Sequence, residues 1–285
     1  MDWRPAVADD APLLADLATA SSGTTVSPAE AETFLQSWSV EVQRAPRPDL
    51  AAAVAVLPPA PGHHRGYGAL WSRHEPNTEL VAQLIRLATS TPGVRVLQVT
   101  SEYPAEVAEL QAQGFVEAFP VWTMTHDNET TGTPALPAPL RDARWTEVVG
   151  LYAAYEQAYC DQRLVEPHTA EGLDQLVRDG AFAADLSTFA LSPDGRLAGF
   201  VLAFGNDRGG VELGPIGTVP AWRGRGVSSA LFASTLTRCR DSRRAPITLT
   251  VDGESPTGAH RLYLRHGFQI TSRLIAYHLH LPGQP

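Results

Sequence analysis

The chain has 285 residues, 44% of them hydrophobic, and a formal net charge of −9. This length and composition predict a soluble globular protein of one large domain or two ordinary ones. The acidic balance argues against a nucleic-acid or anionic-membrane partner and favours attraction of a cationic substrate. Two cysteines are too few for a disulfide scaffold. The sequence contains no apolar run of membrane length, and we expect no leader. We therefore expect a cytoplasmic protein.

The first 127 residues predict a complete α/β unit. Helices are expected at 9–20, from 28 onward, at 77–90 and at 104–113. Strands are expected at 3–6, 38–43, 50–57, 66–72, 94–100 and 121–126. The next residues, 128–140, are polar and then rich in proline, which is typical of a linker.

The same order of elements returns in the second half, residues 141–285. Helices are expected at 145–158, 169–178, 227–237 and 256–266. Strands are expected at 189–192, 196–204, 211–219, 247–251 and 275–281. Placing Gly114-Phe115 on Gly267-Phe268 superposes the two halves. The sequence therefore predicts a tandem repeat of one α/β fold.

One stretch of the second half, residues 211–231, combines a broken strand, a glycine turn and a helix start: VELGPIGTVPAWRGRGVSSAL. Pro215 has no N–H, so the strand should separate from one neighbour and leave backbone groups unpaired. Gly224 and Gly226 precede the helix, where free N–H groups and the helix dipole favour an anion. Arg223 and Arg225 add positive charge. The stretch predicts a pyrophosphate site.

Other phosphate motifs do not match this stretch. A P-loop requires a lysine after its second glycine, and the chain contains no lysine. A dinucleotide fingerprint requires a third glycine where Ser229 stands, and an acidic residue roughly twenty positions on. An ordinary strand–turn–helix without a ligand remains the alternative.

The stretch resembles motif A of the GNAT superfamily of N-acetyltransferases, V-x-P-x-x-[RQ]-x-x-G-x-[GA]. Pro220, Arg223 and Gly226 fill the pattern, while Thr218 replaces the valine and Ser228 the last small residue. The resemblance implies acetyl-CoA as co-substrate and no metal. The cofactor-binding residues that it indicates are Gly217, Thr218, Val219, Arg223, Gly224, Arg225, Gly226, Val227, Ser228 and Ser229.

A second match follows in residues 249–268, which resemble motif B of the same superfamily. Ala259, Leu262 and Tyr263 are followed by Gly267-Phe268 in the family's spacing. The resemblance implies that Tyr263 lies near the cofactor sulfur and donates a proton to the departing thiolate. The alternative is a helix tyrosine that packs with its hydroxyl at the surface.

The first half keeps the architecture but lacks these motifs. Leu110 stands where the second half has Tyr263, and the region of its motif A contains Glu75, Pro76 and Glu79 in place of glycines. Residues 65–70, RGYGAL, mimic the phosphate turn but are interpreted as the start of a strand. The pattern is similar to tandem GNAT enzymes such as mycothiol synthase. It implies an α/β (α+β) fold of two GNAT-like domains, each with a mixed, mostly antiparallel twisted sheet flanked by helices.

The remaining catalytic groups follow from what acyl transfer requires. The resemblance implies that an N–H near the end of the motif strand, that of Val219, polarises the thioester carbonyl. Glu212 is the candidate base, on the expectation that its strand face looks into the cleft; a solvated edge carboxylate is the alternative. Asp161 and Arg163 lie where the family has its acceptor loop. Cys160 is interpreted as structural, although an acyl-cysteine route remains open.

The hypothesis is a cytoplasmic acetyl-CoA-dependent N-acetyltransferase that acts by direct transfer on a small amine, which the acidic charge predicts to be cationic. An aminoglycoside-like compound, an amino-sugar conjugate and an amino acid derivative remain open. The first half, 1–127, is expected to shape the substrate site or to be structural, and 141–285 to be catalytic. A non-catalytic acyl-CoA sensor or partner-binding protein, and a protein N-terminal acetyltransferase, are the alternatives. Oligomeric state is not predicted.

Overall fold

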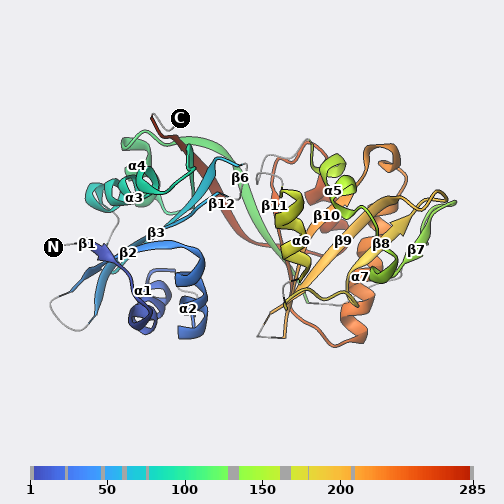
Figure 1. The fold of residues 1–285 in the computed structure, drawn as a ribbon, viewed down its shortest axis with the longest axis horizontal. Helices are drawn as coiled ribbons and strands as arrows, with labels where there is room; N and C mark the ends of the chain where they lie inside the picture. Colours follow the sequence, from blue (N-terminus) through green and yellow to red (C-terminus); the bar gives the residue numbers. More distant parts are fainter. Residues whose placement is uncertain are drawn as a thin grey trace. The chain divides into compact units, whose positions relative to one another are not determined.

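The computed structural model describes residues 3–22, 25–45, 49–59, 63–74, 77–127, 135–160, 168–178, 180–206 and 209–282. The chain divides into two compact units (Figure 1). Unit 1 contains residues 1–119 and 274–285, and unit 2 contains residues 120–273.

Unit 1 begins with strands that lie side by side in chain order: β1 (Trp3–Pro5), β2 (Ser39–Arg44), β3 (Leu50–Leu57), β4 (Arg65–Ser72) and β5 (Val96–Ser101). Neighbouring strands are antiparallel except β4 and β5, which are parallel. The helices are α1 (Ala11–Ser22), α2 (Pro28–Ser37), α3 (Thr78–Ser90) and α4 (Pro104–Ala112), with a 3-10 turn, η1 (Ala8–Asp10), before α1. Residues 65–70 lie within β4, as predicted.

The helices of unit 1 cover both faces of its sheet, because alternate residues of each strand point to opposite faces. Leu14 and Leu17 of α1 pack with Val42 of β2. On the other face, Leu84 of α3 packs with Val54 of β3. The apolar positions along these strands therefore explain why two layers of helices are needed.

The first helix begins later than predicted. Asp10 belongs to η1, and α1 starts at Ala11. The Asp10 carboxylate accepts the Val7 N–H at 2.9 Å and pairs with Arg4 at 2.6 Å. This pairing satisfies a carboxylate that is only 2% exposed.

Unit 2 repeats this order with β7 (Arg141–Ala143), β8 (Thr188–Leu191), β9 (Leu197–Gly205), β10 (Val211–Thr218) and β11 (Ile247–Asp252). Its helices are α5 (Leu151–Tyr159), α6 (Ala170–Arg178), α7 (Val227–Asp241) and α8 (Ala259–Arg265), with 3-10 turns η2 (Trp145–Glu147) and η3 (Pro220–Trp222). Its strands are antiparallel except β10 and β11, which are parallel. The mixed α/β fold class predicted from the sequence is confirmed.

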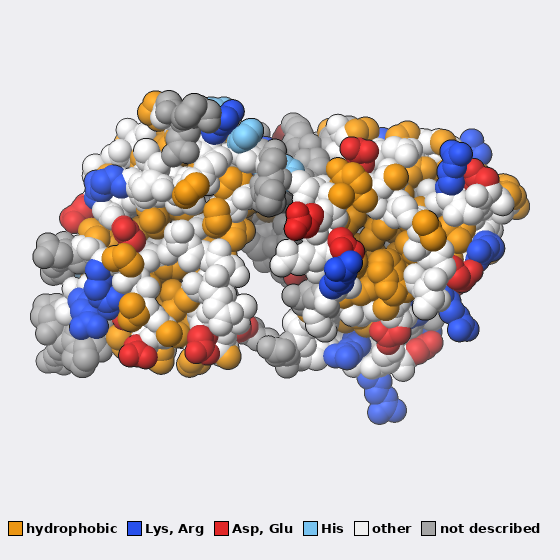
Figure 2. Space-filling view, viewed as in Figure 1, with side chains coloured by type: hydrophobic (Ala, Val, Ile, Leu, Met, Phe, Trp, Pro, Cys, Tyr) orange, Lys and Arg blue, Asp and Glu red, His pale blue; other side chains and the backbone are white. Residues whose placement is uncertain are grey.

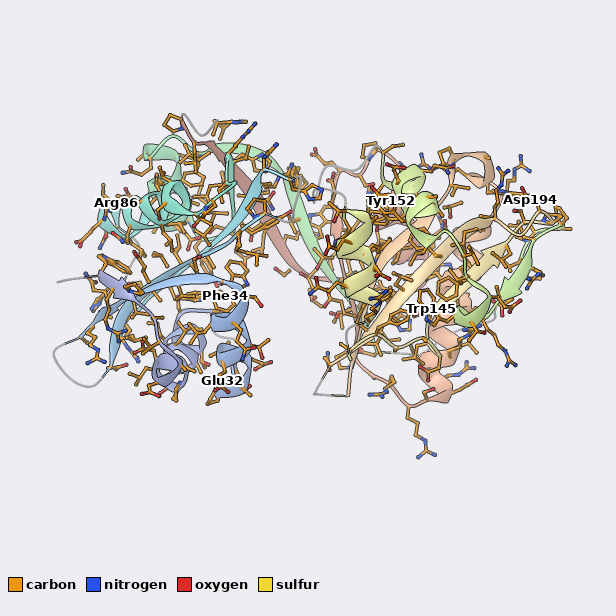
Figure 3. The ribbon with its side chains drawn as sticks, in the orientation of Figure 1. Glu32, Phe34, Arg86, Trp145, Tyr152 and Asp194 are labelled. Atoms are coloured by element: carbon orange, nitrogen blue, oxygen red, sulfur yellow. The ribbon has the colours of Figure 1, made fainter. Side chains whose placement is uncertain are left out.

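Helices also cover both faces of the sheet of unit 2. Phe232 of α7 packs with Tyr263 of α8 on one face. Tyr155 of α5 packs with Phe200 of β9 on the other. Trp145 of η2, labelled in Figure 3, packs edge-to-face against Phe182 with ring centroids 5.1 Å apart.

Three helix boundaries in unit 2 differ from the prediction. Glycines in the left-handed region cap two helices: α5 starts after Gly150 (φ 71°) and α8 after Gly258 (φ 66°). The predicted helix 145–158 is therefore a 3-10 turn followed by α5, and the helix predicted from Pro256 begins at Ala259. Helix α7 continues to Asp241, past the predicted end at 237.

Each unit completes its sheet with a strand from the other half of the sequence. The last strand, β12 (Gln269–His280), pairs antiparallel with β5, and β6 (Val116–His126) pairs antiparallel with β11. The predicted domain ranges therefore differ from the compact units: residues 120–127 lie in unit 2 and residues 274–285 in unit 1.

Candidate active site

Strand β10 separates from β11 soon after it begins. It pairs with β9 from Val211 to Thr218, but with β11 at Val211 and Glu212 alone. Its register on β9 is irregular between Leu213 and Ile216, around Pro215, which has no N–H to donate. The predicted separation of this strand from one neighbour is present. It leaves residues 213–218 of β10 unpaired with β11, and this unpaired edge is called the gap below.

The irregularity moves Glu212 to a different face than expected. Glu212 lies opposite Phe204, and Gly217 lies opposite Phe200, so these residues share the face covered by α5. Ile216 and Thr218 lie opposite Val201 and Gly199, on the other face. The expectation that Glu212 shares a face with Ile216 and Thr218 is wrong, because an extra residue in β10 reverses the alternation. Glu212 is solvent-exposed.

The backbone donor expected at Val219 is already used. The Val219 N–H donates to the Ala198 carbonyl of β9 at 3.0 Å. N–H groups alternate between the two sides of a strand, so those of Ile216 and Thr218 point toward the gap. The expectation that Val219 polarises a carbonyl is therefore not met in this structure; Thr218 carries the backbone donor that faces the gap.

The turn after β10 has the form expected of an anion site. Gly224 and Gly226 have φ of 71° and 83°, and a Cβ at either would meet nothing within 4 Å. In the described part of the chain, the amides of Gly224, Arg225 and Gly226 have no hydrogen-bond partner. Gly226 is the N-cap residue of α7, and no side chain caps the helix start. Free N–H groups, open space and a helix N-terminus together fit the pyrophosphate of acetyl-CoA.

The two arginines of the turn do different things. Arg223 donates from Nε to the Thr218 carbonyl at 3.2 Å and from Nη2 to the Ala158 carbonyl at 3.0 Å. It therefore ties the turn to β10 and to the end of α5. The exposed Arg225 guanidinium lies 5.0 Å from the Trp222 ring centroid, a cation–π distance.

The first turn of α7 is held through its hydroxyl groups. Ser228 Oγ lies 2.6 Å from Thr218 Oγ1, and Ser229 Oγ lies 2.8 Å from His266 Nε2. Val227 is buried in the core. These contacts fix the helix start against β10 and against the end of α8, so the backbone amides, rather than the serine hydroxyls, face the open turn.

Tyr263 lies in the core with an unpartnered hydroxyl. Its residue exposure is 6%, and its ring packs 5.1 Å from that of Phe232. No described residue hydrogen-bonds to its hydroxyl, which is not among the fully buried unpaired polar atoms. Burial raises the pKa of Tyr263 above its usual value, so the phenol is protonated at neutral pH and can donate.

Tyr159, which no sequence motif had indicated, also belongs to this region. It follows Tyr155 by one helical turn on α5, and the two rings stack with centroids 4.4 Å apart. The Tyr159 hydroxyl accepts the Ile216 N–H at 2.9 Å. Spacing along α5 predicts that Tyr155 and Tyr159 share a face, but a contact with β10 requires the tertiary structure.

Gly217 has a packing role in addition to the predicted one. A Cβ there would lie 2.5 Å from Phe200 Cζ and 2.8 Å from Ala158 Cβ. The glycine therefore lets α5 approach β10 closely enough for Tyr159 to reach Ile216.

The remaining candidate residues are those of the predicted acceptor loop and the two cysteines. Asp161 and Arg163 lie outside the described residues. Cys160 is exposed and Cys239 buried, both as free thiols. Where the chain is described, no three His, Cys, Asp or Glu side chains gather as metal ligands. In the same regions, every helix is too short or too polar to cross a membrane.

Residues 147–268 match the model of the family described as "Acetyltransferase (GNAT) family". No curated protein matches the chain in sequence. Among solved structures, a GCN5-related N-acetyltransferase from Sphaerobacter thermophilus has a TM-score of 0.83 at 21% identity, covering 99% of this chain and 96% of its own. A tandem GNAT protein from the clavulanic acid biosynthesis pathway has a TM-score of 0.73 at 14% identity, covering 99% of both chains.

A glucosamine N-acetyltransferase region of a fungal multi-domain β-N-acetylglucosaminidase has a TM-score of 0.74 at 13% identity. That similarity covers 98% of this chain and 38% of the other. These three structures share the fold of the whole chain, both units included.

Proposed function

We propose that the chain is an acyltransferase that moves the acetyl group of acetyl-CoA to the amine of a small molecule, by direct transfer in a ternary complex. The match of residues 147–268 to the GNAT acetyltransferase family model supports the acyl-transfer chemistry. The observation that carries this proposal is the glycine turn at 224–226, whose unpartnered amides border open space at the start of α7.

The residues of the turn and of β10 divide the work of binding. The amides from Gly224 to Ser229 hold the pyrophosphate, and Arg225 adds charge. Arg223 holds the turn in place through the carbonyls of Thr218 and Ala158. The backbone of Gly217, Thr218 and Val219 lies along the pantetheine arm. Acetyl-CoA supplies the activated thioester carbonyl.

Two side chains move protons in the proposed reaction. The Tyr263 hydroxyl donates to the thiolate that leaves. Glu212, directly or through water, takes the ammonium proton of the acceptor; its exposure supports access to water, although it lies on the α5 face of β10. Asp161 and Arg163 are proposed to contact the acceptor.

The acceptor is proposed to be a cationic small amine, since the net charge of −9 attracts cations. On the face shown in Figure 2, the described arginine side chains are dispersed among acidic and apolar ones. This dispersed arrangement argues against a nucleic-acid partner. The free thiols of Cys160 and Cys239 agree with a reducing compartment, and the cytoplasm is the proposed location.

A non-catalytic acyl-CoA sensor is the alternative of another class. It would need the turn but has no use for an unpartnered phenol at position 263. Thiol release from acetyl-CoA, measured with a panel of small amines and of peptides with free N-termini, separates the possibilities. Tight cofactor binding without turnover on any amine would favour the sensor, and turnover restricted to peptides would favour an N-terminal acetyltransferase.

The variant Gly226→Asp tests the pyrophosphate site directly. An aspartate here is strained by the positive φ and places a carboxylate among the amides. We expect calorimetry to show at least a 100-fold loss of acetyl-CoA affinity, by an order-of-magnitude estimate. Gly150→Asp is the matched control, because Gly150 also has a positive φ (71°) and open space but caps α5. Equal acetyl-CoA affinity in the two variants would contradict the assignment of the turn as the pyrophosphate site.

A further inference from the structure

The Tyr159 hydroxyl occupies the gap that β11 leaves beside β10. Strand β10 pairs with β11 at Val211 and Glu212, and Ile216 lies beyond that pairing. In a paired strand, the Ile216 N–H would donate to a backbone carbonyl of the neighbouring strand. Here it donates to the Tyr159 hydroxyl oxygen at 2.9 Å. A phenol from α5 thus stands where the backbone carbonyl of a neighbouring strand would be expected.

The hydrogen of this hydroxyl is uncommitted. The contact with Ile216 uses the hydroxyl oxygen as acceptor. Among the described residues, no atom accepts the hydroxyl hydrogen. Burial raises the pKa of Tyr159, and the nearby Tyr263 raises it further. The phenol is therefore protonated at neutral pH. A hydroxyl that accepts one hydrogen bond becomes a better donor in the next.

The phenol of Tyr263 lies near that of Tyr159. The Ile216 side chain packs against the cluster that contains Tyr263, while its N–H contacts Tyr159. Two protonated phenols, one on α5 and one on α8, therefore lie near each other, and the hydroxyl of Tyr159 contacts the separated part of β10. One leaving thiolate needs one acid, so the second hydroxyl has no role in the proposed reaction so far.

The reaction also needs a donor for the carbonyl oxygen, and backbone donors are scarce here. The N–H of Val219 is used by Ala198 and that of Ile216 by Tyr159. Thr218 has an N–H on the gap side, and its carbonyl accepts from Arg223. The Tyr159 hydroxyl thus engages the Ile216 N–H and offers its own O–H as a donor instead. This O–H lies farther into the gap than the backbone N–H does.

We propose that Tyr159 is a catalytic residue whose hydroxyl donates a hydrogen bond to the thioester carbonyl oxygen. This inference rests on the proposed function. When the amine nitrogen attacks, the carbonyl π electrons move onto the oxygen, and the Tyr159 hydrogen bond stabilises the charge without transfer of its proton. Collapse restores the C=O bond, breaks the C–S bond and leaves its electron pair on sulfur.

Tyr155 provides a matched comparison on the same helix. Its hydroxyl also accepts a backbone N–H, that of His168 at 2.8 Å, but on the side of the α5–α6 connection rather than at β10. Tyr155→Phe and Tyr159→Phe therefore remove the same chemical group and the same type of hydrogen bond, and they differ in whether the hydroxyl faces the gap.

The test compares acetyl-CoA with S-ethyl-CoA, which lacks the carbonyl, by calorimetry without an acceptor. We expect the wild type to bind acetyl-CoA about tenfold more tightly than S-ethyl-CoA, the strength of one hydrogen bond to a carbonyl. In Tyr159→Phe this ratio should fall to about one, and kcat should drop roughly 100-fold. Tyr155→Phe should keep the ratio.

Infrared spectroscopy of acetyl-CoA labelled with ¹³C at the carbonyl gives a second measurement. The bound carbonyl stretch should lie lower in the wild type than in Tyr159→Phe. Should Tyr159→Phe not fold, 3-fluorotyrosine at position 159 keeps the ring and its contact with Ile216, and a stronger donor should lower the stretch further.

The outcomes separate the two proposals. Binding of neither coenzyme by the wild type would overturn the proposed function. Binding and turnover by the wild type, with the same affinity ratio and carbonyl stretch in Tyr159→Phe, would overturn the role of Tyr159 alone.

Discussion

Tyr263 combines a buried ring with a hydroxyl that has no hydrogen-bond partner among the described residues. At 6% exposure and packed against Phe232 and Phe268, the ring contributes to the core, and a phenylalanine would serve the packing equally well. The hydroxyl has no hydrogen-bond partner among the described residues and is not fully buried, so it adds no hydrogen bond that stabilises the fold. The hydroxyl is therefore better explained by a ligand that it contacts than by stability.

Tyr263→Phe should lower kcat by at least about 100-fold while the acetyl-CoA dissociation constant changes less than about threefold. Removal of an unpartnered hydroxyl should leave the free energy of unfolding unchanged or raise it. Steady-state kinetics, calorimetry and thermal unfolding measure these effects. Tyr103→Phe, at a 50% exposed position of unit 1, is the control. A wild-type rate would assign Tyr263 to packing alone.

His278 makes the stability of unit 1 depend on pH. Burial, with smaller effects of Arg65 and His280, lowers its pKa from 6.5 to about 4, and its Nε2 lies 2.9 Å from Gln98 Oε1. Between these values the unfolded chain binds a proton that the folded chain does not. Stability from this residue is therefore lost as the pH falls from 6.5 toward 4.

His278→Gln should remove this acid sensitivity, since glutamine can donate to Gln98 and does not titrate. Urea unfolding at pH 7 and pH 4.5 should show a smaller loss of stability in the variant, by about 1–2 kcal/mol. The exposed His64 gives the control His64→Gln. The same pH dependence in His278→Gln and the wild type would contradict the assignment.

At the scale of elements, the strand–turn–helix of residues 211–241 could be predicted because its signals are local. Proline removes a donor and glycine adopts positive φ wherever they stand. The face of Glu212 could not be predicted, because alternation fails when a strand gains a residue against its partner. Tyr159 could not be found either, because its contact with Ile216 joins residues 57 positions apart.

The approach of α5 to β10 depends on Gly217. Gly217→Ala should reduce the free energy of unfolding by about 1–3 kcal/mol, since its Cβ would overlap Phe200 and Ala158. If α5 moves away, the contact between Tyr159 and Ile216 is lost, and kcat should fall as well. Gly180→Ala, with open space and no positive φ, should change neither quantity. Urea unfolding and kinetics measure both.

At the scale of the whole molecule, the order of elements in each half was predictable and the partners of the last strands were not. Hydrophobic alternation marks β6 and β12 as strands, but it does not say which sheet a strand joins. Pairing of β12 with β5 and of β6 with β11 joins the two halves of the sequence within each sheet. A sequence without internal contacts suggests domains made of contiguous residues. That expectation fails here, because β6 and β12 each pair with a strand from the other half of the sequence.

The two units differ at the helix that follows the fourth strand of each. In unit 1, Asn77 caps α3, accepting the Leu80 N–H at 3.0 Å, and Glu79 lies in the first turn. In unit 2, Gly226 leaves the start of α7 without a side-chain cap, and its first turn contains no acid. A capped and acidic helix start repels phosphate, and an uncapped one attracts it.

We therefore expect one acetyl-CoA per chain. Isothermal titration calorimetry should give a stoichiometry of about one for the wild type and no measurable site in Gly226→Asp, because that change blocks the turn before α7 and leaves α3 untouched. Asn77→Gly removes the cap of α3 but keeps Glu79, so it should not create a second site. A second site of similar affinity that persists in Gly226→Asp would place cofactor binding in unit 1 and contradict the difference drawn between the two helix starts.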